Sequence, residues 1–174
     1  VPSMVVNQIQ GVSELTTAVF TMEAIVPTEQ DRKLGNMTLG TTRLLYIAQG
    51  EVRAGVDLNA ITAEDVILNE AANSVVVQIP SAEILDQKLD VTESQVYDYD
   101  RGFLNLGPDV VPQFQTLAQQ KTLEKVLSAA CQEGILEQAR DRAQLTIKEL
   151  LTASGYTNVT VVSEVSPASQ CAVK

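Results

Sequence analysis

The sequence predicts an α+β fold in which a mainly antiparallel sheet packs against one long C-terminal helix, with a closing strand after it. Residues 15–100 hold runs rich in Val, Ile, Thr and Tyr, which are bounded by Gly, Pro and Asn and are typical of strands. Residues 109–154 are instead dominated by Ala, Leu, Gln, Glu, Lys and Arg, which have strong helix propensity. Strands followed by a helix, with no interdomain linker, indicate a single α+β domain over residues 1–174.

The long helix has its own start and stop signals. Asp109 suits the N-cap, Pro112 falls in the first turn, where no backbone donor is needed, and Gly155 follows the end. Its apolar stripe consists of Leu123, Leu127, Cys131, Ile135, Ala139, Ala143, Ile147 and Leu151. Steps of four residues overshoot a helical turn by about 40°, so the helix either wraps across a twisted surface or breaks. Gly134 is the predicted break; a coiled coil is the alternative, although its heptad pattern is short.

The first part of the chain is predicted to alternate between strands and turns. A short amphipathic helix at about 3–12 precedes a first strand at 15–26, which Pro27 is expected to end. The polar residues 28–37 are interpreted as an exposed connection between strands.

Gly50 is expected to allow a tight reversal between two further strands. The strand at 39–48 is nearly continuous in apolar residues, and the strand at 51–58 alternates with a period of two. The remaining elements are expected in this order: a turn or short helix at 59–65, a hairpin of 66–68 and 74–79, a helix or turn from Ser81, a strand at 90–100, a last strand at about 157–165, and an irregular tail.

Composition excludes several classes of function. The chain carries 12 Lys and Arg against 22 Asp and Glu, a net charge of −10, which argues against binding to nucleic acid or anionic membrane surfaces. It contains no histidine, so the commonest general base and the commonest zinc ligand are missing. It also lacks tryptophan and any apolar run of about 18 residues that would span a membrane. We therefore expect no cofactor, no metal site, no catalytic triad and no membrane contact from this segment itself.

The two cysteines, Cys131 within the long helix and Cys171 near the C-terminus, are within reach of each other. The helix covers about 33 Å from residue 131 to its end, and the extended chain that follows can return about 50 Å. A disulfide between them would stabilise the fold by roughly 3–4 kcal/mol on the chain-entropy estimate, and it would indicate an oxidising compartment. The alternative is two unrelated thiols, one buried and one in the tail.

The cluster Tyr97-Asp98-Tyr99-Asp100 is the most conspicuous candidate binding site. On a strand, Asp98 and Asp100 share one face, where two carboxylates could bind a hard cation or act as an acid and base pair. A solvated strand face with the tyrosines packed inward explains the same pattern. Asp57 is a second candidate, for a ligand amine, and its structural alternative is to bond turn amides or cap the following element.

Three glycine-containing and apolar segments carry a resemblance to a known family. They are YIAQGEVRAGVDL at 46–58, the hairpin arm VVVQIP ending at Pro80, and GIL at 134–136 with Ala139, Ala143, Leu150, Leu151 and Gly155. Together they resemble the bacterial domain of unknown function 4230 family over about residues 8–162. The resemblance implies a bacterial, often membrane-anchored extracytoplasmic domain, with the anchor preceding Val1, and it implies no activity.

We therefore expect a non-enzymatic, extracytoplasmic, membrane-tethered domain that binds or assembles with a protein partner. The long helix, about 60 Å or more if continuous, offers an interaction surface. The alternatives are a carboxylate-based hydrolase, or a module that binds a cation or small molecule, using Asp98, Asp100 or Asp57.

Overall fold

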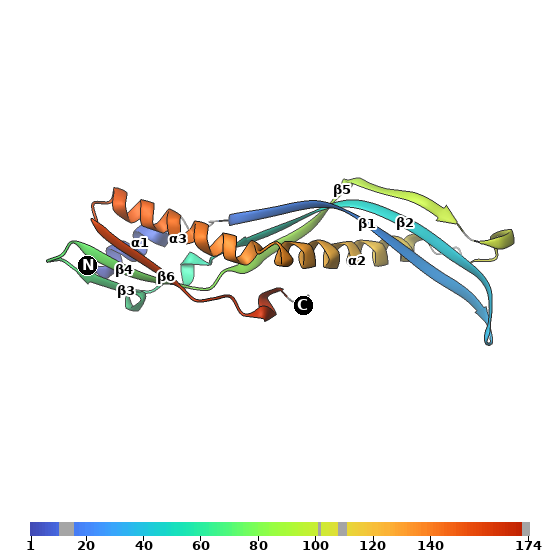
Figure 1. The fold of residues 1–174 in the computed structure, drawn as a ribbon, viewed down its shortest axis with the longest axis horizontal. Coiled ribbons are helices and arrows are strands. Elements are labelled where there is room, and N and C mark those ends of the chain that lie inside the picture. The colour runs from blue at the N-terminus through green and yellow to red at the C-terminus, as the bar shows by residue number, and fades with distance from the viewer. Residues whose placement is uncertain (11–15, 101, 108–110, 172–174) are drawn as a thin grey trace.

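The computed structural model describes residues 1–10, 16–100, 102–107 and 111–171, without the side chains of residues 16–17, 91–100, 103 and 111–114. The chain forms an elongated molecule (Figure 1). Its helices and strands are, in order, α1 (Pro2–Gln10), β1 (Thr16–Leu34), β2 (Met37–Gly55), β3 (Val66–Asn69), β4 (Ser74–Ile79), β5 (Glu83–Asp100), α2 (Val111–Gln132), α3 (Ile135–Ala153) and β6 (Asn158–Ser163). Strands, then helices, then a closing strand confirm the predicted α+β class.

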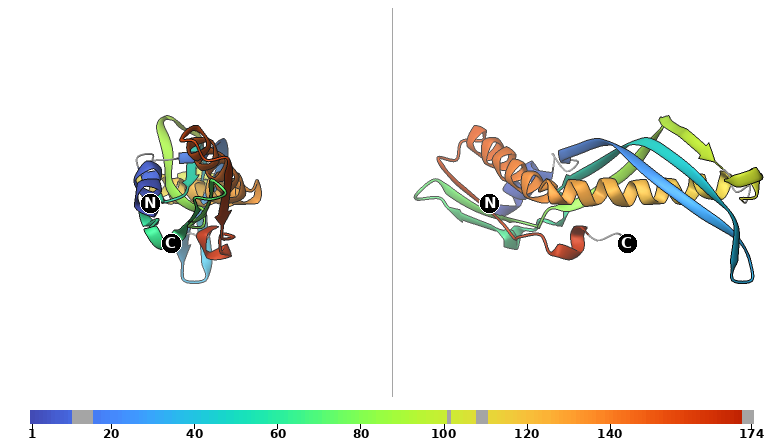
Figure 2. Two further views of the ribbon diagram at one scale, coloured as in Figure 1. Left: turned by 90° about the vertical axis from the view of Figure 1, so that its left-hand side faces the viewer. Right: turned by 45° about the vertical axis from the view of Figure 1, so that its right-hand side comes forward.

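The strands form two three-stranded sheets. The larger sheet has the order β1-β2-β5 and is antiparallel throughout, and α2 lies along one of its faces (Figures 1 and 2). The smaller sheet has the order β3-β4-β6, in which β4 pairs antiparallel with β3 and parallel with β6. Helices α1 and α3 lie at the same end of the molecule as this smaller sheet (Figure 1).

The first strand does not end at Pro27, as the sequence had indicated. β1 continues past it and pairs with β2, so the predicted connection at 28–37 is mostly strand, closed by a two-residue turn. β1 is an edge strand, and the carbonyl of Ile25 accepts a hydrogen bond from Lys125 Nζ at 3.0 Å, which places that carbonyl on the side away from β2. Backbone groups alternate along a strand, so Pro27 also faces the open edge, where its missing N–H removes no ladder hydrogen bond.

The predicted reversal at Gly50 is also wrong. β2 is one strand of 19 residues, which joins the two strands expected at 39–48 and 51–58. Gly50 lies in its middle, and a Cβ at this position would lie 2.6 Å from Cγ2 of Val126 on α2. The glycine therefore allows a close approach of helix and strand, and a turn is not its role.

β5 begins at Glu83, so the helix or turn expected from Ser81 is wrong and the strand expected at 90–100 is longer than predicted. The sequence EILDQKLD does not alternate, and one of the three irregularities in the register with β2 falls within it, between Ile84 and Asp86. Pairing with β2 decides the conformation here, against the local pattern. By contrast, the short helical turns at Leu58–Ala60 and Ala63–Asp65, the β3–β4 hairpin and the last strand are confirmed. The tail, expected to be irregular, contains one short 3₁₀ turn, Ala168–Cys171.

The long helix breaks where the sequence predicted. Gly134 has φ 78°, a left-handed conformation that glycine adopts without strain, and it separates α2 from α3. The predicted stripe is buried in α3, through Ile135, Ala139, Ala143, Ile147 and Leu151. In α2 the buried face is shifted and runs through Ala118, Thr122, Val126, Leu127 and Ala130. A break frees the two helices to bury different faces, and the predicted N-cap, Asp109, lies outside the described residues.

The buried apolar side chains form two clusters. The larger cluster includes Val5, Ile9, Leu58, Val75 and Ile147, so α1, α3 and the smaller sheet share one core. The smaller cluster consists of Leu44, Tyr46, Ala48 and Ala118, with Leu89 packed against it. This second cluster holds α2 against β2 and β5. It thereby helps to fix the distance between α2 and the edge strand β5.

Candidate functional site

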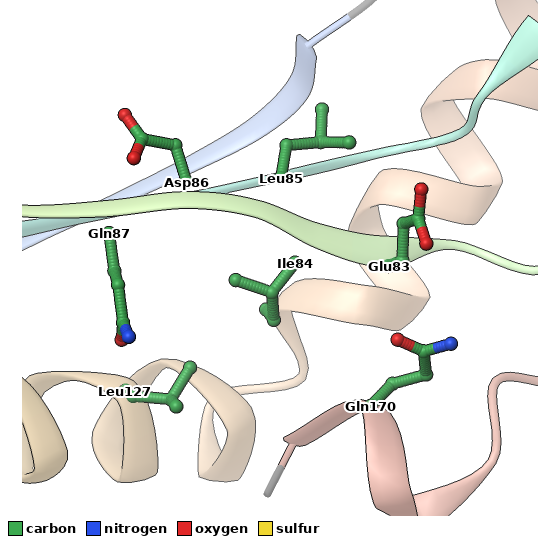
Figure 3. A pocket seen from close by; sticks show the side chains of 7 residues that line it. All are labelled: Glu83, Ile84, Leu85, Asp86, Gln87, Leu127 and Gln170. Carbon is green, nitrogen blue, oxygen red and sulfur yellow. The ribbon is translucent and has the colours of Figure 1, made fainter. Parts of the chain in front are cut away.

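A groove opens beside the start of β5, between that strand, α2 and the C-terminal tail (Figure 3). We call it the β5 groove, and it is lined by Glu83, Ile84, Leu85, Asp86, Gln87, Leu127 and Gln170. Its volume is about 290 Å³, at the lower limit of the roughly 300–1,000 Å³ of small-molecule pockets. The groove therefore has room for one or two side chains of a larger partner.

The backbone of β5 is open on the side of the groove. β5 is an edge strand, with Lys88 opposite Glu51 and Gln87 opposite Val52 of β2. Because the Ile25 carbonyl faces away from β2, alternation along β2 directs the backbone groups of Glu51 toward β5 and those of Val52 toward β1. The backbone of Lys88 is therefore bonded to β2, whereas the N–H and C=O of Gln87 point to the open edge.

The side chains of the groove divide into an apolar floor and an acidic lining. Ile84 and Gln87 point from β5 toward α2, where Leu127 lies, whereas Glu83 and Asp86 point to the opposite side of the strand (Figure 3). Leu127 is buried, and Ile84 packs against the larger core. The lining contains the carboxylates of Glu83 and Asp86 but no lysine or arginine, and the nearest cation in the register is Arg53, opposite Asp86 on β2. Such a surface complements an extended chain that carries an aliphatic side chain next to a basic one.

The C-terminal tail forms one wall of the groove because two links hold it in place. The hydroxyl of Ser166 donates a hydrogen bond of 2.6 Å to the carbonyl of Ala82, just before β5 begins. Further along, Cys171 forms a disulfide with Cys131 on α2, with the Cα atoms 6.0 Å apart. Gln170 precedes Cys171 directly, so the disulfide fixes this side chain at the mouth of the groove.

A second hollow, of about 380 Å³, lies on the face of the larger sheet opposite to α2 and includes Glu51 and Lys88. Oε1 of Glu51 accepts a hydrogen bond of 2.7 Å from Arg53 Nε and lies 3.3 Å from Lys88 Nζ. The hydrogen bond from Arg53, followed by that from Lys88, lowers the pKa of Glu51 below its ordinary value. Glu51 is therefore an ionised partner of two cations, which is unsuited to the role of a general acid.

Asp57 has a structural role in the chain. It lies just after β2, and its Oδ1 accepts a hydrogen bond of 3.0 Å from the backbone N–H of Asn59. This contact caps the short helical turn Leu58–Ala60. The sequence had offered this structural alternative beside a ligand-binding role.

The acidic cluster at the other end of β5 is far from Asp57. The backbone of Asp98 pairs with Leu45 and that of Asp100 with Arg43, whereas Asp57 follows the far end of β2. Twelve residues of strand separate the two places, roughly 40 Å. One site cannot contain both, and the side chains of residues 97–100 lie outside the description, so the acidic pair stays a prediction.

Two kinds of site are not found in the described part of the chain. There, no three side chains of the His, Cys, Asp or Glu type gather closely enough to hold a metal ion. None of the helices described is both long and apolar enough to cross a membrane.

The β5 groove was not predicted from the sequence. Residues 81–85 had been interpreted as a helix or turn, and an edge strand cannot be identified before its pairing is known. The signal that exists is indirect, since Cys171 places Gln170 near the helix once the disulfide is assumed. Nothing in the sequence indicates that Ile84 and Leu127 share a groove.

Comparison with known proteins agrees with the resemblance seen in the sequence. A family model described as "Protein of unknown function (DUF4230)" matches residues 7–161, which is most of the chain. No curated protein and no solved structure matches this chain.

Proposed function

We propose, from the premise that the chain belongs to the DUF4230 family of proteins of unknown function, that it is an extracytoplasmic binding domain for a partner protein. In this proposal an extended segment of the partner adds a strand to the open edge of β5. One apolar side chain of the segment enters the β5 groove. The domain is non-enzymatic, and a segment that precedes this sequence tethers it to a membrane.

One observation carries the proposal: an open strand edge and an apolar hollow lie side by side. In strand addition, main-chain hydrogen bonds supply affinity and side-chain pockets supply specificity. The backbone of Gln87 supports the first requirement, and Ile84 with Leu127 supports the second. The carboxylates of Glu83 and Asp86 favour a segment that contains lysine or arginine.

The proposed compartment has separate support. Disulfides persist in oxidising compartments and are rare in the cytosol, so the bond between Cys131 and Cys171 is consistent with an extracellular location. The membrane tether is supported by the family resemblance, which implies an anchor before Val1.

The test uses Gln87, whose backbone N–H points to the open edge of β5 and not to β2. Gln87→Pro removes this donor, and an edge position tolerates proline, as Pro27 shows on β1. Gln87→Ala keeps the donor and is the matched control. Peptides of about ten residues are selected from a random displayed library on the wild-type domain, and their affinities for all three proteins are measured by calorimetry.

We expect the selected peptides to be basic and apolar, and to bind wild type and Gln87→Ala alike. Gln87→Pro loses about tenfold or more in affinity, because a hydrogen bond worth about 1 kcal/mol is lost and the ring crowds the incoming strand. The proposal fails if no peptide is enriched, or if Gln87→Pro binds as tightly as Gln87→Ala.

The rival is a hydrolase or a cation-binding module at Asp98 and Asp100. A cation bound by the folded state must raise the unfolding midpoint, so calcium is added during thermal unfolding of wild type and of Asp98→Asn. Our proposal expects no shift in either protein. A calcium-dependent rise that Asp98→Asn removes would instead support the rival.

A further inference from the structure

The far end of the β1–β2 hairpin extends beyond the rest of the sheet. β5 leaves β2 after Arg43, and the loop at residues 102–107 reaches only to Gly40. Beyond this point β1 and β2 continue as two strands alone, clear of the body of the molecule (Figures 1 and 2). We call residues 32–39 the hairpin tip. Two-stranded ribbons are marginally stable in water, so this one is suited to gain contacts from a partner.

The tip is both apolar and basic. Leu34 is 68% exposed and Met37 is 65% exposed, which are among the highest values for large apolar side chains in the described chain. Arg32 and Lys33, directly before Leu34, are exposed as well. In a chain with a net charge of −10, two adjacent cations beside exposed aliphatic side chains are unusual.

These properties match the β5 groove. The groove offers an apolar floor of Ile84 and Leu127 on one face of β5 and the carboxylates of Glu83 and Asp86 on the other face, and no lysine or arginine lines it, although Arg53 lies opposite Asp86 on β2. The tip offers aliphatic side chains next to two cations, and its strand β1 is the other edge strand of the same sheet. Charge, apolar character and open backbone edges are therefore complementary between the two surfaces.

The tip cannot reach the groove of its own chain. Asp86 of the groove pairs with Arg53, whereas the tip ends at Leu39 on the same strand. Fourteen residues of β2 separate them, roughly 45 Å at about 3.3 Å per residue. The two surfaces therefore meet only between two molecules.

We propose that the hairpin tip of one copy of this chain binds in the β5 groove of a second copy. This inference rests on the proposed function, since it names the partner of the same groove. The contact joins two different surfaces, so it is head-to-tail, and it produces a ring or an open chain of copies. Side chains alternate along the added strand, so Lys33 lies against Glu83 and Asp86 of the neighbour, and Leu34, on the other face, fills the apolar floor.

The test is a charge exchange in the full chain, read by sedimentation velocity over a range of concentrations. One variant carries Arg32→Glu and Lys33→Glu in the tip, and the other carries Glu83→Lys and Asp86→Lys in the groove. Each variant alone brings like charges together. In an equimolar mixture, the acidic tip of the first variant meets the basic groove of the second. The unchanged basic tip of the second variant also matches the unchanged acidic groove of the first.

The wild type is expected to associate as its concentration rises, each variant alone to stay monomeric, and the mixture to associate again. The control is Lys121→Glu with Lys148→Glu, which changes net charge as much as the tip variant does and is expected to associate like wild type. Circular dichroism verifies that all variants fold. Misfolded variants would not associate again when they are mixed. Association in the mixture therefore shows that each variant alone stays monomeric because of its changed charges and not because of a folding defect.

Three outcomes overturn the inference. If wild type stays monomeric while the library-selected peptides still bind the groove, the second copy is not the partner but the proposed function stands. If wild type stays monomeric and no peptide binds, both fail. If wild type stays monomeric but binds phosphatidylglycerol vesicles, and the tip variant does not, the tip recognises a lipid surface instead.

Discussion

Gly50 of β2 lies directly against Val126 of α2, and a Cβ on Gly50 would come within 2.6 Å of the valine side chain. This contact lets the helix approach the larger sheet closely at this point. Since the β5 groove lies between β5 and the same helix, its width depends on that approach.

Gly50→Ala is expected to destabilise the protein by about 1–3 kcal/mol, because the added methyl group overpacks a contact that cannot relax along the strand. Val126→Ala alone also destabilises, through lost apolar contact. The double variant is expected to be more stable than the sum of the two changes predicts. Denaturant unfolding of the four proteins measures this coupling, and strictly additive changes would show that the two residues do not share the contact.

Replacement of both Cys131 and Cys171 by alanine is expected to lower the free energy of unfolding by about 4 kcal/mol. The disulfide closes a loop over a sequence separation of 40 residues, and its loss frees the unfolded chain. Denaturant unfolding measures the change, and wild type with a thiol reductant is the control that leaves the sequence intact. If the free energy of unfolding changed by only a few tenths of a kcal/mol both in the double variant and in the reduced wild type, the role assigned to the disulfide would be contradicted.

Glu51 is expected to contribute a pH-dependent part of the stability. Its pKa is lowered in the folded state by Arg53 and then by Lys88, so the contribution is fully present above the ordinary value of 4.5. It is lost as the pH falls through the lowered pKa of the folded state. The stability difference between wild type and Glu51→Gln, measured by denaturation from pH 7 to pH 3, should therefore shrink below about pH 4.5. A difference that grows on acidification would reverse the sign of this assignment.

The helical half of the chain was predictable because its signals are local. Gly134 marks the break and Gly155 follows the end of α3, where the N–H of Tyr156 donates to the carbonyl of Leu151. Periodicity in α3 also identified the buried face. The face of α2 was only partly found: Leu127 of the predicted stripe is buried, but most of the buried face runs through Ala118, Thr122, Val126 and Ala130, since the break lets the two helices bury different sides.

The boundaries of the long strands were not predictable for a related reason. Pro27 and Gly50 are strand terminators by their usual preferences, yet neither ends a strand here. Pro27 is tolerated because it lies at an open edge, and Gly50 because a helix packs on it. Both reasons are tertiary, and the β5 groove was missed on the same ground, since it depends on which strand forms the edge.

The central claim, that a partner strand adds to β5 at the groove, is tested most directly by amide hydrogen exchange of β5 residues, followed by nuclear magnetic resonance. In the dilute, unassociated protein the amide of Gln87 should exchange rapidly and that of Lys88 slowly, because only the latter is bonded to β2. On addition of a peptide selected for binding, the amide of Gln87 should become protected while that of Lys88 changes little. A Gln87 amide that exchanges at the same rate with and without saturating peptide would contradict strand addition at this edge.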